Sequence, residues 1–476
     1  MTVHLDTTQP PPHPSTLAEA HALIDLLWQV VGQLQTRVTE LEEQLRLTSR
    51  NSSKPPSSDG PAVQRAGSAT GGSGRRRGGQ PGHRGVQRAL VPVEVVDQVH
   101  PCLPPAVCAC GGEVQVAEQP CVRHQVFELP PIQPVVTEYQ CYAGVCTRCG
   151  QRIVGDLPVG VPRGQFGPGV VSLIGLLAGD YHLSVRQIQR LLHDVFHLDI
   201  GLGTVSYSQA QVSEAVAAVV ETTQQAVPQA AVVNADETSH RQGTVRQWLW
   251  VAVSHPLSVF RISVQRNRAA AQALLGPRFG GILGSDRYSV YQWVDPSHRQ
   301  LCWAHLRRDF QRIAERPGRA GEIGQELLTY GHWLFTIWHR YREGQLPVEV
   351  FKDLMGGLRR LVELALEEGA RCDHAATAHT CQHLLDLKVA LWTFVDTPGV
   401  EPTNNAAEQA LRAHVIWRKL SFGTQAERGN RFIERIRTVT ATCRRQGRAR
   451  WDYWREAVKA FFFGRPAPPL VADPLA

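Results

Sequence analysis

Three apolar segments between residues 230 and 265 constrain the fold most, because they have the composition and spacing of neighbouring β-strands. They read AAVVNADET, VRQWLWVAVSH and LSVFRISVQ, and the gaps between them have the length of hairpins. A helical segment, RAAAQALLG, follows, then another strand, GGILGSD, and a short strand that leads into a helix, RQLCWAHLRRDFQRIAE. Three neighbouring strands followed by strands that alternate with helices predict a mixed α/β sheet.

Acidic residues stand where two of these strands end and where a later helix begins. Asp236 closes the first apolar segment, Asp286 closes the fourth, and Glu408 lies in the first turn of a helix in TNNAAEQALR. Such carboxylates can meet at one edge of a sheet, and oxygen-only clusters bind hard cations such as Mg²⁺. Two such ions can activate a water molecule or a 3′-hydroxyl group and stabilise the leaving oxygen of a phosphodiester. The pattern therefore predicts a site for phosphoryl transfer.

Several of these acids also have simpler interpretations. If Asn405 is the N-cap of the helix, Glu408 is its third residue, and the two form a capping box in which the carboxylate binds only a backbone N–H. Glu237 points to the opposite side from Asp236 if the strand continues, which makes it a second-choice ligand. Asp295 is expected to cap a turn, and Asp309 to be solvated or salt-bridged.

The composition of the whole chain limits the class of protein. A chain of 476 residues with 43% hydrophobic residues is long enough for two to four globular domains. No segment approaches the roughly 20 apolar residues that span a bilayer, and the first residues show no secretory signal. We therefore expect a cytoplasmic protein without a membrane partner, whose 11 cysteines are thiols or metal ligands rather than disulfides.

Basic residues are concentrated in two stretches. Residues 50–90 carry a net charge of +7 and residues 412–450 one of +9, although the whole chain carries only +7. Two basic stretches on an otherwise acidic protein favour a polyanion partner such as DNA over a merely solvated surface. The residues expected to contact DNA phosphates are Arg75, Arg76, Arg77, Arg307, Arg308, Arg412, Arg418 and Lys419.

Polar residues near the acids have two possible roles each. Asn404 and Asn405 can hydrogen-bond near metal ions or phosphate, or cap the helix. His305, in CWAHLRR, can approach DNA or brace the site, although a satisfied structural histidine is the commoner role. Arg412 lies one turn after Glu408 on the same helix face, where it can contact DNA or pair with Glu408.

A heptad repeat marks the N-terminal region, residues 15–49. Its seam consists of apolar residues at two heptad positions: Leu17, Ile24, Val31, Val38 and Leu45 at one, and Ala20, Leu27, Leu34 and Leu41 at the other. This combination favours a parallel two-stranded coiled coil, and hence a homodimer or higher oligomer. The alternative is an amphipathic helix packed on its own chain. Residues 50–90, rich in Ser, Gly, Pro and Arg, are expected to form a flexible basic linker.

Cysteine pairs occur in the next region, residues 91–160. Cys108-x-Cys110 and Cys146-x-x-Cys149 are each followed by glycine and lie on strand-like sequence. Paired thiolates on two turns predict a structural Zn²⁺ ion in a zinc-ribbon-like domain, although the first pair is one residue shorter than the usual C-x-x-C. The alternative is a set of unliganded buried cysteines.

Helical patterns flank the strands. Residues 165–228 have the outline of a helix-turn-helix, in which Ser184 is an N-cap and the second helix starts at Thr204 or Ser206. The first of these helices has an apolar face of Ile188, Leu191, Leu192 and Val195. Many helical hairpins share this outline. Residues 318–395 are helical again, and residues 451–476 are expected to form a C-terminal helix and tail.

Four motifs in this order, NADET, GSDRYSVY, CWAHLRRDF and TNNAAEQALR, resemble the transposases of the insertion sequence 66 family of bacterial mobile elements. The heptads, the NSSKPPSSD and GGQPGHRG segments and the cysteine region match that family too, so the resemblance covers nearly the whole chain. It implies a DDE catalytic core on a ribonuclease H-like fold over residues 230–450, with a helical insertion at 318–395. Asp236, Asp286 and Glu408 match the three acids of that core.

The resemblance and the residue patterns together predict a DNA transposase. It would bind the terminal inverted repeats of its element, cleave a strand with two Mg²⁺ or Mn²⁺ ions, and join the freed 3′-hydroxyl to target DNA. The family also implies accessory proteins of the same element and a location in the bacterial cytoplasm, at the nucleoid when bound to DNA. Two alternatives remain open: a dimeric DNA-binding regulator without catalysis, and a metal-dependent nuclease that cuts but does not join.

Overall fold

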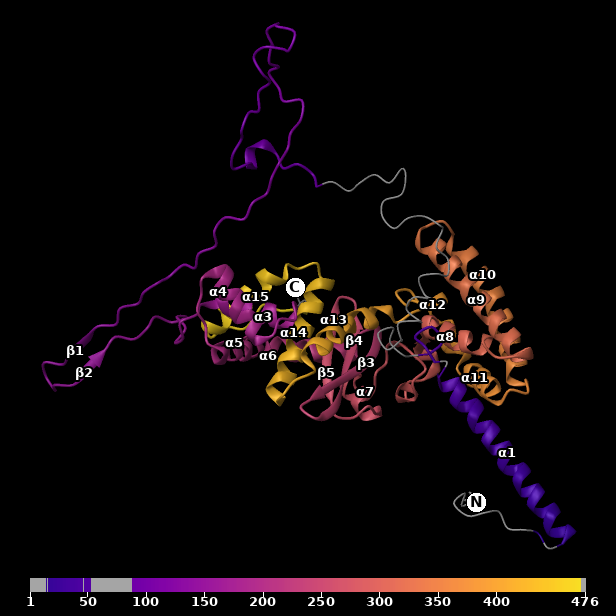
Figure 1. The fold of residues 1–476 in the computed structure, drawn as a ribbon. Helices are drawn as coiled ribbons and strands as arrows, with labels where there is room; N and C mark the ends of the chain where they lie inside the picture. The colour runs from indigo at the N-terminus through magenta and orange to yellow at the C-terminus, as the bar shows by residue number, and fades with distance from the viewer. Residues whose placement is uncertain (1–13, 15, 46, 53–87, 472–476) are drawn as a thin grey trace.

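A five-stranded mixed sheet forms the centre of the computed structural model, which describes residues 14, 16–45, 47–52 and 88–471 (Figure 1). The strand order is β5-β4-β3-β6-β7. Three strands form an antiparallel meander: β3 (Val232–Gln242), β4 (Val245–Ser254) and β5 (Leu257–Ser263). The other two, β6 (Ile282–Ser285) and β7 (Arg299–Leu301), run parallel to β3. The predicted mixed α/β sheet is confirmed.

Helices cover both faces of the sheet, because its central strands are apolar on both sides. On one face, α7 (Arg268–Leu275) packs on a core that includes Trp250. On the other, α13 (Asn405–Ser421) packs on a core that includes Leu249. These two residues are neighbours in β4 and point to opposite faces. The sheet therefore holds α13 directly against β3 and β4.

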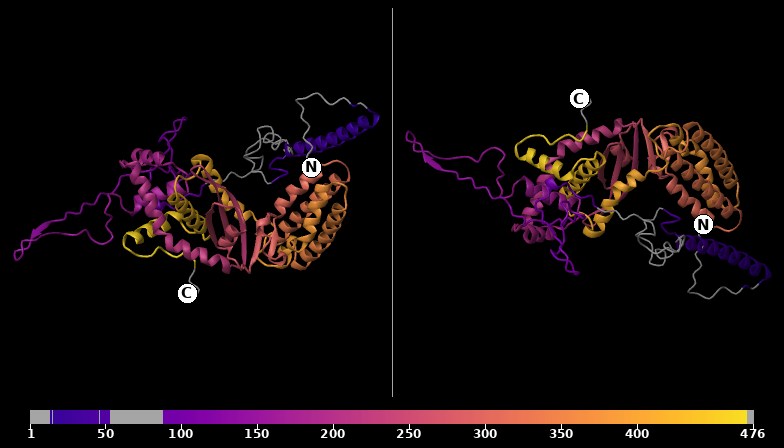
Figure 2. Two further views of the ribbon diagram at one scale, coloured as in Figure 1. Left: turned by 90° about the horizontal axis from the view of Figure 1, so that it is seen from below. Right: turned by 90° about the horizontal axis from the view of Figure 1, so that it is seen from above.

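Two helical units stand at the two ends of the sheet in all three views (Figures 1 and 2). The unit beside β5 shares one apolar core and consists of α3 (Pro168–Gly179), α4 (Val185–Phe196), α5 (Leu202–Ala215), α6 (Ala217–Ala226), α14 (Glu427–Arg445) and α15 (Arg450–Phe462). The unit beside β7 has a second core and consists of α8 (Trp303–Ala314), α9 (Gly318–Arg342), α10 (Val348–Ala370), α11 (Ala375–Asp386) and α12 (Thr393–Asp396). Residues 165–228 thus share their core with the C-terminal helices rather than closing on themselves.

Short 3₁₀ turns join several of these elements. They are η2 (Val93–Val95), η3 (Val227–Gln229), η4 (Ser289–Tyr291), η5 (Pro296–His298) and η6 (Lys388–Leu391). As expected, Asp295 caps one of them: its Oδ1 accepts a hydrogen bond from the Ser297 N–H at 2.9 Å. Asp309 is salt-bridged, to Arg287 at 2.8 Å and to Arg312 at 3.3 Å.

α14 covers the outer edge of β5, which would otherwise present unpaired backbone N–H groups. Three of its side chains accept hydrogen bonds from alternate N–H groups of the strand: Thr442 from Ser258 (3.1 Å), Thr438 from Phe260 (3.1 Å) and Glu434 from Ile262 (2.5 Å). The spacing of four residues puts these acceptors on one helix face. Burial raises the pKa of Glu434 to about 6. The strand edge is therefore satisfied by side chains from the C-terminal part of the chain.

α4 begins where the sequence predicts. Ser184 and Gln187 form a capping box, each side chain binding the backbone N–H of the other. Within the predicted apolar face, Ile188 and Leu192 are fully buried. Val195 is instead 45% exposed, so the buried face is narrower than predicted.

The second helix of the pair, α5, begins earlier than predicted. Its first residue is Leu202, with the extended Gly201 as N-cap, rather than Thr204 or Ser206. Glycine is an acceptable N-cap because it tolerates the required backbone conformation without a side chain. The turn between α4 and α5 is correspondingly short.

The α8–α9 corner is packed closely enough to require a glycine. A Cβ on Gly324 of α9 would lie 2.2 Å from the backbone N of Ala314. Replacing Gly324 with Ala is therefore expected to lower the free energy of unfolding by about 1–3 kcal/mol, the usual cost of overpacking. Chemical denaturation can measure the change.

Gly356 provides the matched control, since a Cβ on it would meet nothing within 4 Å in the middle of α10. Gly356→Ala is expected to raise the free energy of unfolding by about 0.5–1 kcal/mol, because alanine favours the helix. Equal effects of the two substitutions would contradict the close packing at Gly324.

The predicted heptad region forms a single long helix, α1 (Leu17–Leu45), with Thr16 and Glu19 binding one another's backbone N–H groups at its start. Apart from Ala20, the apolar seam is exposed, from 43% at Leu41 to 85% at Leu45. Within the described part of the chain the seam does not pack on other elements, which contradicts the alternative interpretation. None of the described helices has the length and apolarity to cross a membrane.

Residues 88–160 contain little regular structure. Their only strands, β1 (Ala143–Val145) and β2 (Arg152–Val154), form a short antiparallel hairpin. The remaining segments predicted as strand-like form no strand, because their side chains are almost all exposed and no apolar face is buried. Most of the predicted linker, including Arg75, Arg76 and Arg77, lies outside the described residues.

Candidate active site

Asp236 and Asp286 lie next to each other where the parallel pairing of β3 and β6 ends. The last parallel pair joins Asn234 and Gly284, and each aspartate follows that pair by two residues. Asp286 directly follows β6, and its charge acts on Asp236, so the two carboxylates lie near each other. A Cβ on Gly284 would lie 2.4 Å from Asn234 Oδ1, so only glycine fits at this crossing.

Asp236 lies in the middle of β3. It does not close the strand, which differs from the prediction. The strand continues to Gln242 because β4 pairs with it antiparallel throughout, with Val251 opposite Asp236. Only the parallel pairing with β6 ends here. The prediction of a strand end was therefore wrong, while Asp286 does directly follow β6.

Glu408 comes from the first turns of α13, and its carboxylate does not cap the helix. The helix begins at Asn405, with Asn404 as N-cap and no side-chain capping bond. Glu408 is therefore the fourth helical residue, and both the Asn405 cap and the capping box are wrong. Glu408 Oε1 is buried and has no hydrogen-bond partner among the described residues. The ring nitrogen Nδ1 of His305 lies 3.5 Å from this oxygen.

The surroundings of Asp236 are those of a crowded carboxylate site. Burial raises its pKa well above the usual range, and the charges of Glu237, Asp286 and Glu408 raise it further. The N–H of Glu237, which donates to Asp236 Oδ1 at 2.8 Å, acts in the opposite direction. All three predicted catalytic acids therefore interact electrostatically at this edge of the sheet.

The chemistry of the three carboxylates, oxygen ligands with negative charge, suits a hard divalent cation such as Mg²⁺ or Mn²⁺. An ion held by Asp236, Asp286 and Glu408 would relieve the like-charge repulsion and use the unpartnered Glu408 Oε1. The three acids do not all place oxygens within 4.8 Å of one another; in the described ranges only Cys302, His305 and Glu408 form such a group.

Glu237 follows Asp236 in β3 and forms a buried ion pair with Arg266, while the charge of Asp286 also acts on its carboxylate and helps to raise its pKa. Arg266 Nη2 and Nε donate to its Oε1 at 2.6 and 2.9 Å, and the Tyr291 hydroxyl donates to its Oε2 at 2.7 Å. Burial and the neighbouring carboxylates hold the pKa of Tyr291 well above its usual range. Glu237 therefore anchors the far side of the strand.

A buried arginine supports the turn that carries Asp286. Arg299 Nη2 donates to Ser285 Oγ at 3.2 Å and to the Asp286 carbonyl at 3.1 Å. Asp286 Oδ1 accepts the Tyr288 N–H at 2.9 Å. Sequence reasoning did not find Arg299, because its contacts come from strand pairing rather than from a local motif.

Cys302 and His305 complete the site from the start of α8. Cys302 is the N-cap and His305 the third helical residue, so the C-x-x-H spacing brings both side chains to one helix end. His305 Nδ1 lies 3.5 Å from Glu408 Oε1 and has no hydrogen-bond partner in the described structure, so it is not a satisfied structural histidine. The Asn404 N–H donates to Cys302 Sγ at 3.4 Å. Burial raises the pKa of Cys302 to about 11. Sequence reasoning did not single out Cys302.

Asn404 holds the start of α13 beside β3. Its Nδ2 donates to the Ala235 carbonyl at 3.4 Å, next to Asp236. Its Oδ1 is buried without a hydrogen-bond partner among the residues described. Of the two asparagines, Asn404 is therefore the one that faces the site, and Asn405 is exposed.

Arg307 and Arg308 line a cavity of about 740 Å³ that borders the start of α13. Arg50 and His339 line it too, as does Asn405. Arg50 belongs to a segment that docks beside α8, where Asn51 Nδ2 donates to Glu315 Oε2 at 2.6 Å. The cavity thus gathers three arginines, together with Glu315, beside the start of α13.

The three remaining residues predicted to contact DNA, Arg412, Arg418 and Lys419, differ in their exposure. Arg412 and Lys419 are exposed, and no ion pair joins Arg412 to Glu408 in the part of the chain that the structure covers. Arg418 is partly buried, and its Nη1 donates to Thr238 Oγ1 at 2.8 Å and to Ser239 of β3. Arg418 therefore braces the strand rather than presenting a free guanidinium group.

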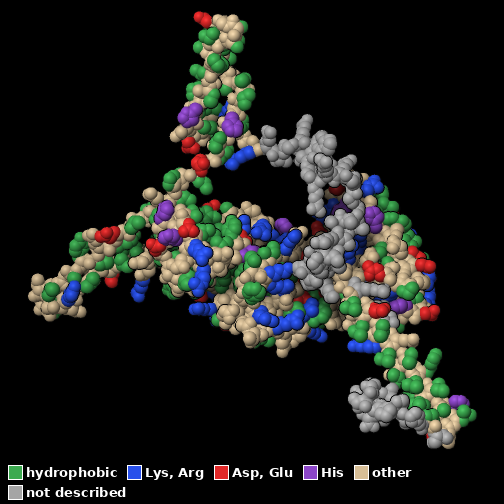
Figure 3. Space-filling model, viewed as in Figure 1, with side chains coloured by type: hydrophobic (Ala, Val, Ile, Leu, Met, Phe, Trp, Pro, Cys, Tyr) green, Lys and Arg blue, Asp and Glu red, His purple; other side chains and the backbone are tan. Residues whose placement is uncertain are grey.

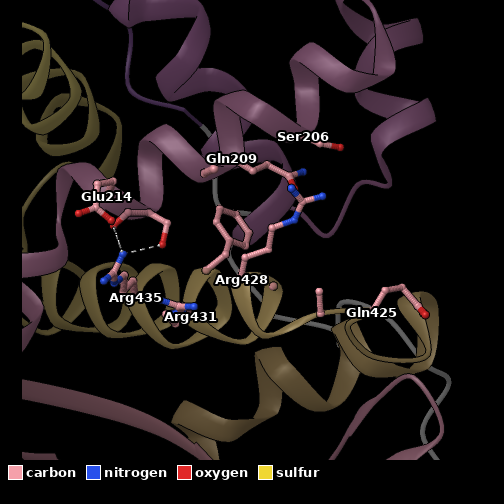
Figure 4. A pocket seen from close by; sticks show the side chains of 12 residues that line it. Ser206, Gln209, Glu214, Gln425, Arg428, Arg431 and Arg435 are labelled. Atoms are coloured by element: carbon pink, nitrogen blue, oxygen red, sulfur yellow. Dashed lines mark hydrogen bonds and ion pairs between the residues drawn. The ribbon is translucent and has the colours of Figure 1, made fainter.

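A groove between α5 and α14 is a second basic surface (Figure 4). It has a volume of about 320 Å³ and is lined by Ser206 and Gln209 of α5 and by Arg428 and Arg431 of α14. The side chains of Gln209 and Arg428 point toward one another across it. Arg435 forms an ion pair with Glu214, in which Nη1 lies 3.1 Å from Oε2. In Figure 3, Lys and Arg side chains gather over the sheet and the helical unit beside β5.

The structure does not bring the two cysteine pairs together. Cys108 lies close to Cys110, and Cys146 to Cys149, but no three of these sulfurs lie within 4.8 Å of one another. The pairs are not buried, so the alternative of buried cysteines is wrong. A zinc ion shared by the four thiolates stays a prediction.

Comparison with known families identifies the chain. The family model described as Transposase IS66 family matches residues 163–431, a span that contains all three acids. The chain belongs to the IS66 transposase family. A family of unknown function, DUF6444, matches residues 9–89 of this transposase-family chain. No curated protein matches it.

Proposed function

We propose that this member of the IS66 family is a DDE-type DNA transposase with a ribonuclease H-like core. Asp236, Asp286 and Glu408 would hold two Mg²⁺ or Mn²⁺ ions, and these ions would supply activation of the attacking hydroxyl and charge stabilisation of the leaving oxygen. The observation that carries this proposal is the position of Asp236 and Asp286, each two residues after the last β3–β6 pair. Glu408 lies near them, and its Oε1 makes no hydrogen bond in the described residues.

Each acid has a separate part in this proposal. Asp236 and Asp286, fixed by strand pairing, bind and orient the ions at the sheet edge. Glu408 closes the site from α13. Asn404, with its unpartnered Oδ1, accepts a hydrogen bond from a water molecule or from the substrate hydroxyl.

The DNA path follows from the basic surfaces. Arg307 and Arg308 bind phosphates beside the acids, and Arg412 and Lys419 extend this contact along α13. The α5–α14 groove receives the terminal inverted repeat, with Ser206 and Gln209 positioned near base edges. Arg75, Arg76 and Arg77 belong to the basic linker and contribute non-specific binding.

Assembly uses the exposed seam of α1, which pairs with a second copy in a coiled coil. A Zn²⁺ ion held by Cys108, Cys110, Cys146 and Cys149 would give residues 91–160 a fixed shape. Accessory proteins of the same element are further partners, and the bacterial cytoplasm and nucleoid are the place of action.

One assay tests the proposal against its two alternatives. The protein is incubated with Mg²⁺, labelled element ends and a plasmid. We expect the label to appear covalently joined to the plasmid, because the freed 3′-hydroxyl attacks the target directly. Cutting without joining would favour a nuclease, and binding alone would favour a non-catalytic regulator.

A further inference from the structure

The start of α8 and the first turns of α13 bring three different ligand atoms together. The sulfur of Cys302, a ring nitrogen of His305 and a carboxylate oxygen of Glu408 all lie within 4.8 Å of one another. Two of these side chains have a buried atom without a hydrogen-bond partner in the described residues, His305 Nδ1 and Glu408 Oε1. These two atoms lie 3.5 Å from each other, too far for a good hydrogen bond. Buried polar atoms are nearly always satisfied, so a cation that binds both atoms would supply the partner that each lacks.

The chemistry of the three atoms differs from that of the acid triad. Sulfur, nitrogen and one oxygen suit a borderline cation such as Zn²⁺ or Co²⁺, whereas Mg²⁺ takes oxygen ligands. The Asn404 N–H, which donates to Cys302 Sγ, would stabilise a bound thiolate. Glu408 is 31% exposed, which leaves a way in for the ion.

We propose that Cys302, His305 and Glu408 form a binding site for a borderline divalent cation such as Zn²⁺, whose occupation withdraws Glu408 from the catalytic ions. The thiol releases its proton to solvent when the sulfur binds the ion. The site would therefore act as an inhibitory metal switch. Its regulatory effect rests on the proposed function, whereas the binding itself does not.

Co²⁺ binding to the full-length chain tests the site without any activity measurement. Cys108, Cys110, Cys146 and Cys149 are replaced by Ser to remove the background of the separate cysteine pairs. We expect one Co²⁺ per chain, a sulfur-to-metal charge-transfer absorption band and the release of one proton. Absence of the band in this chain would overturn the proposal.

Substitutions in the same background assign the ligands. Cys302→Ser should abolish the band, and His305→Ala should weaken Co²⁺ affinity at least about tenfold, since even outer-shell partners of a metal contribute 10- to 100-fold. Cys443→Ser is the matched control, because Cys443 is equally buried and its pKa is likewise raised to about 11. A band that survives Cys302→Ser would refute the assignment.

The regulatory effect has its own measurement. The ratio of Mg²⁺-supported cleavage with and without Zn²⁺ should fall well below one for the unchanged chain and stay near one for Cys302→Ser. Equal inhibition of both would show that Zn²⁺ acts elsewhere. A chain that binds Co²⁺ yet never cleaves DNA would refute the proposed function while leaving the metal site intact.

Discussion

Asp286→Asn is expected to abolish Mg²⁺-dependent strand cleavage while leaving DNA binding intact. The substitution removes a negative charge at the position where the β3–β6 register brings two aspartates together. Loss of one electrostatic stabiliser of a transition state typically costs about 10²- to 10³-fold in rate, and a metal ligand should cost at least as much. Cleavage of labelled element ends measures the loss.

The fold should tolerate this substitution. Asp286 Oδ1 accepts the Tyr288 N–H, and an asparagine oxygen can accept the same bond. Asp295→Asn is the control, because Asp295 is an acid that caps a turn outside the site. Full cleavage by the Asp286 variant, or equal loss in the Asp295 variant, would remove Asp286 from the catalytic set.

The candidate acids could be found from sequence because strand–acid patterns are local, but the details depended on tertiary pairing. The apolar run stops at Asp236 and so predicts a strand end there, whereas pairing with β4 extends the strand to Gln242. Asn405 was one residue from the true N-cap. The contact between His305 and Glu408 joins residues that are far apart in the chain, and no local pattern predicts it.

The basic C-terminal stretch illustrates a further limit of sequence reasoning. Its charge predicts a DNA-facing surface, yet α14 also buries residues against the sheet. Arg437 is 3% exposed, and Arg445 donates to Ser258 Oγ at 2.9 Å. Charge density along a sequence does not distinguish a free guanidinium from one that braces two elements. Arg428 and Arg431 remain exposed.

Asp236→Asn should have opposite effects on activity and on stability. It should lower cleavage at least about 10²-fold, as for any ligand whose charge stabilises the transition state. Without divalent cations it should raise the free energy of unfolding near pH 8. Burial and the charges of Glu237, Asp286 and Glu408 raise the pKa of Asp236 in the folded protein, so its ionised form destabilises the fold.

The sign of the pH dependence follows from this raised pKa. Stability contributed by Asp236 is fully present below its unfolded pKa of about 3.9 and is lost as pH rises through the higher folded value. The gain from Asn should therefore be large at pH 8 and small at the acidic end, with each unit of pKa shift worth about 1.4 kcal/mol.

Mg²⁺ should reverse the order of the two proteins, because an ion bound to the native acids stabilises only a site that keeps its charge. Calorimetry at pH 5 and pH 8, with chelator or with Mg²⁺, measures all four conditions, and Asp295→Asn should show no such gain. If the Asp236 variant is less stable than the unchanged chain in chelator at pH 8, then the carboxylates do not repel one another. The acids would then owe their proximity to packing alone, and the electrostatic case for a metal site at this sheet edge would fail.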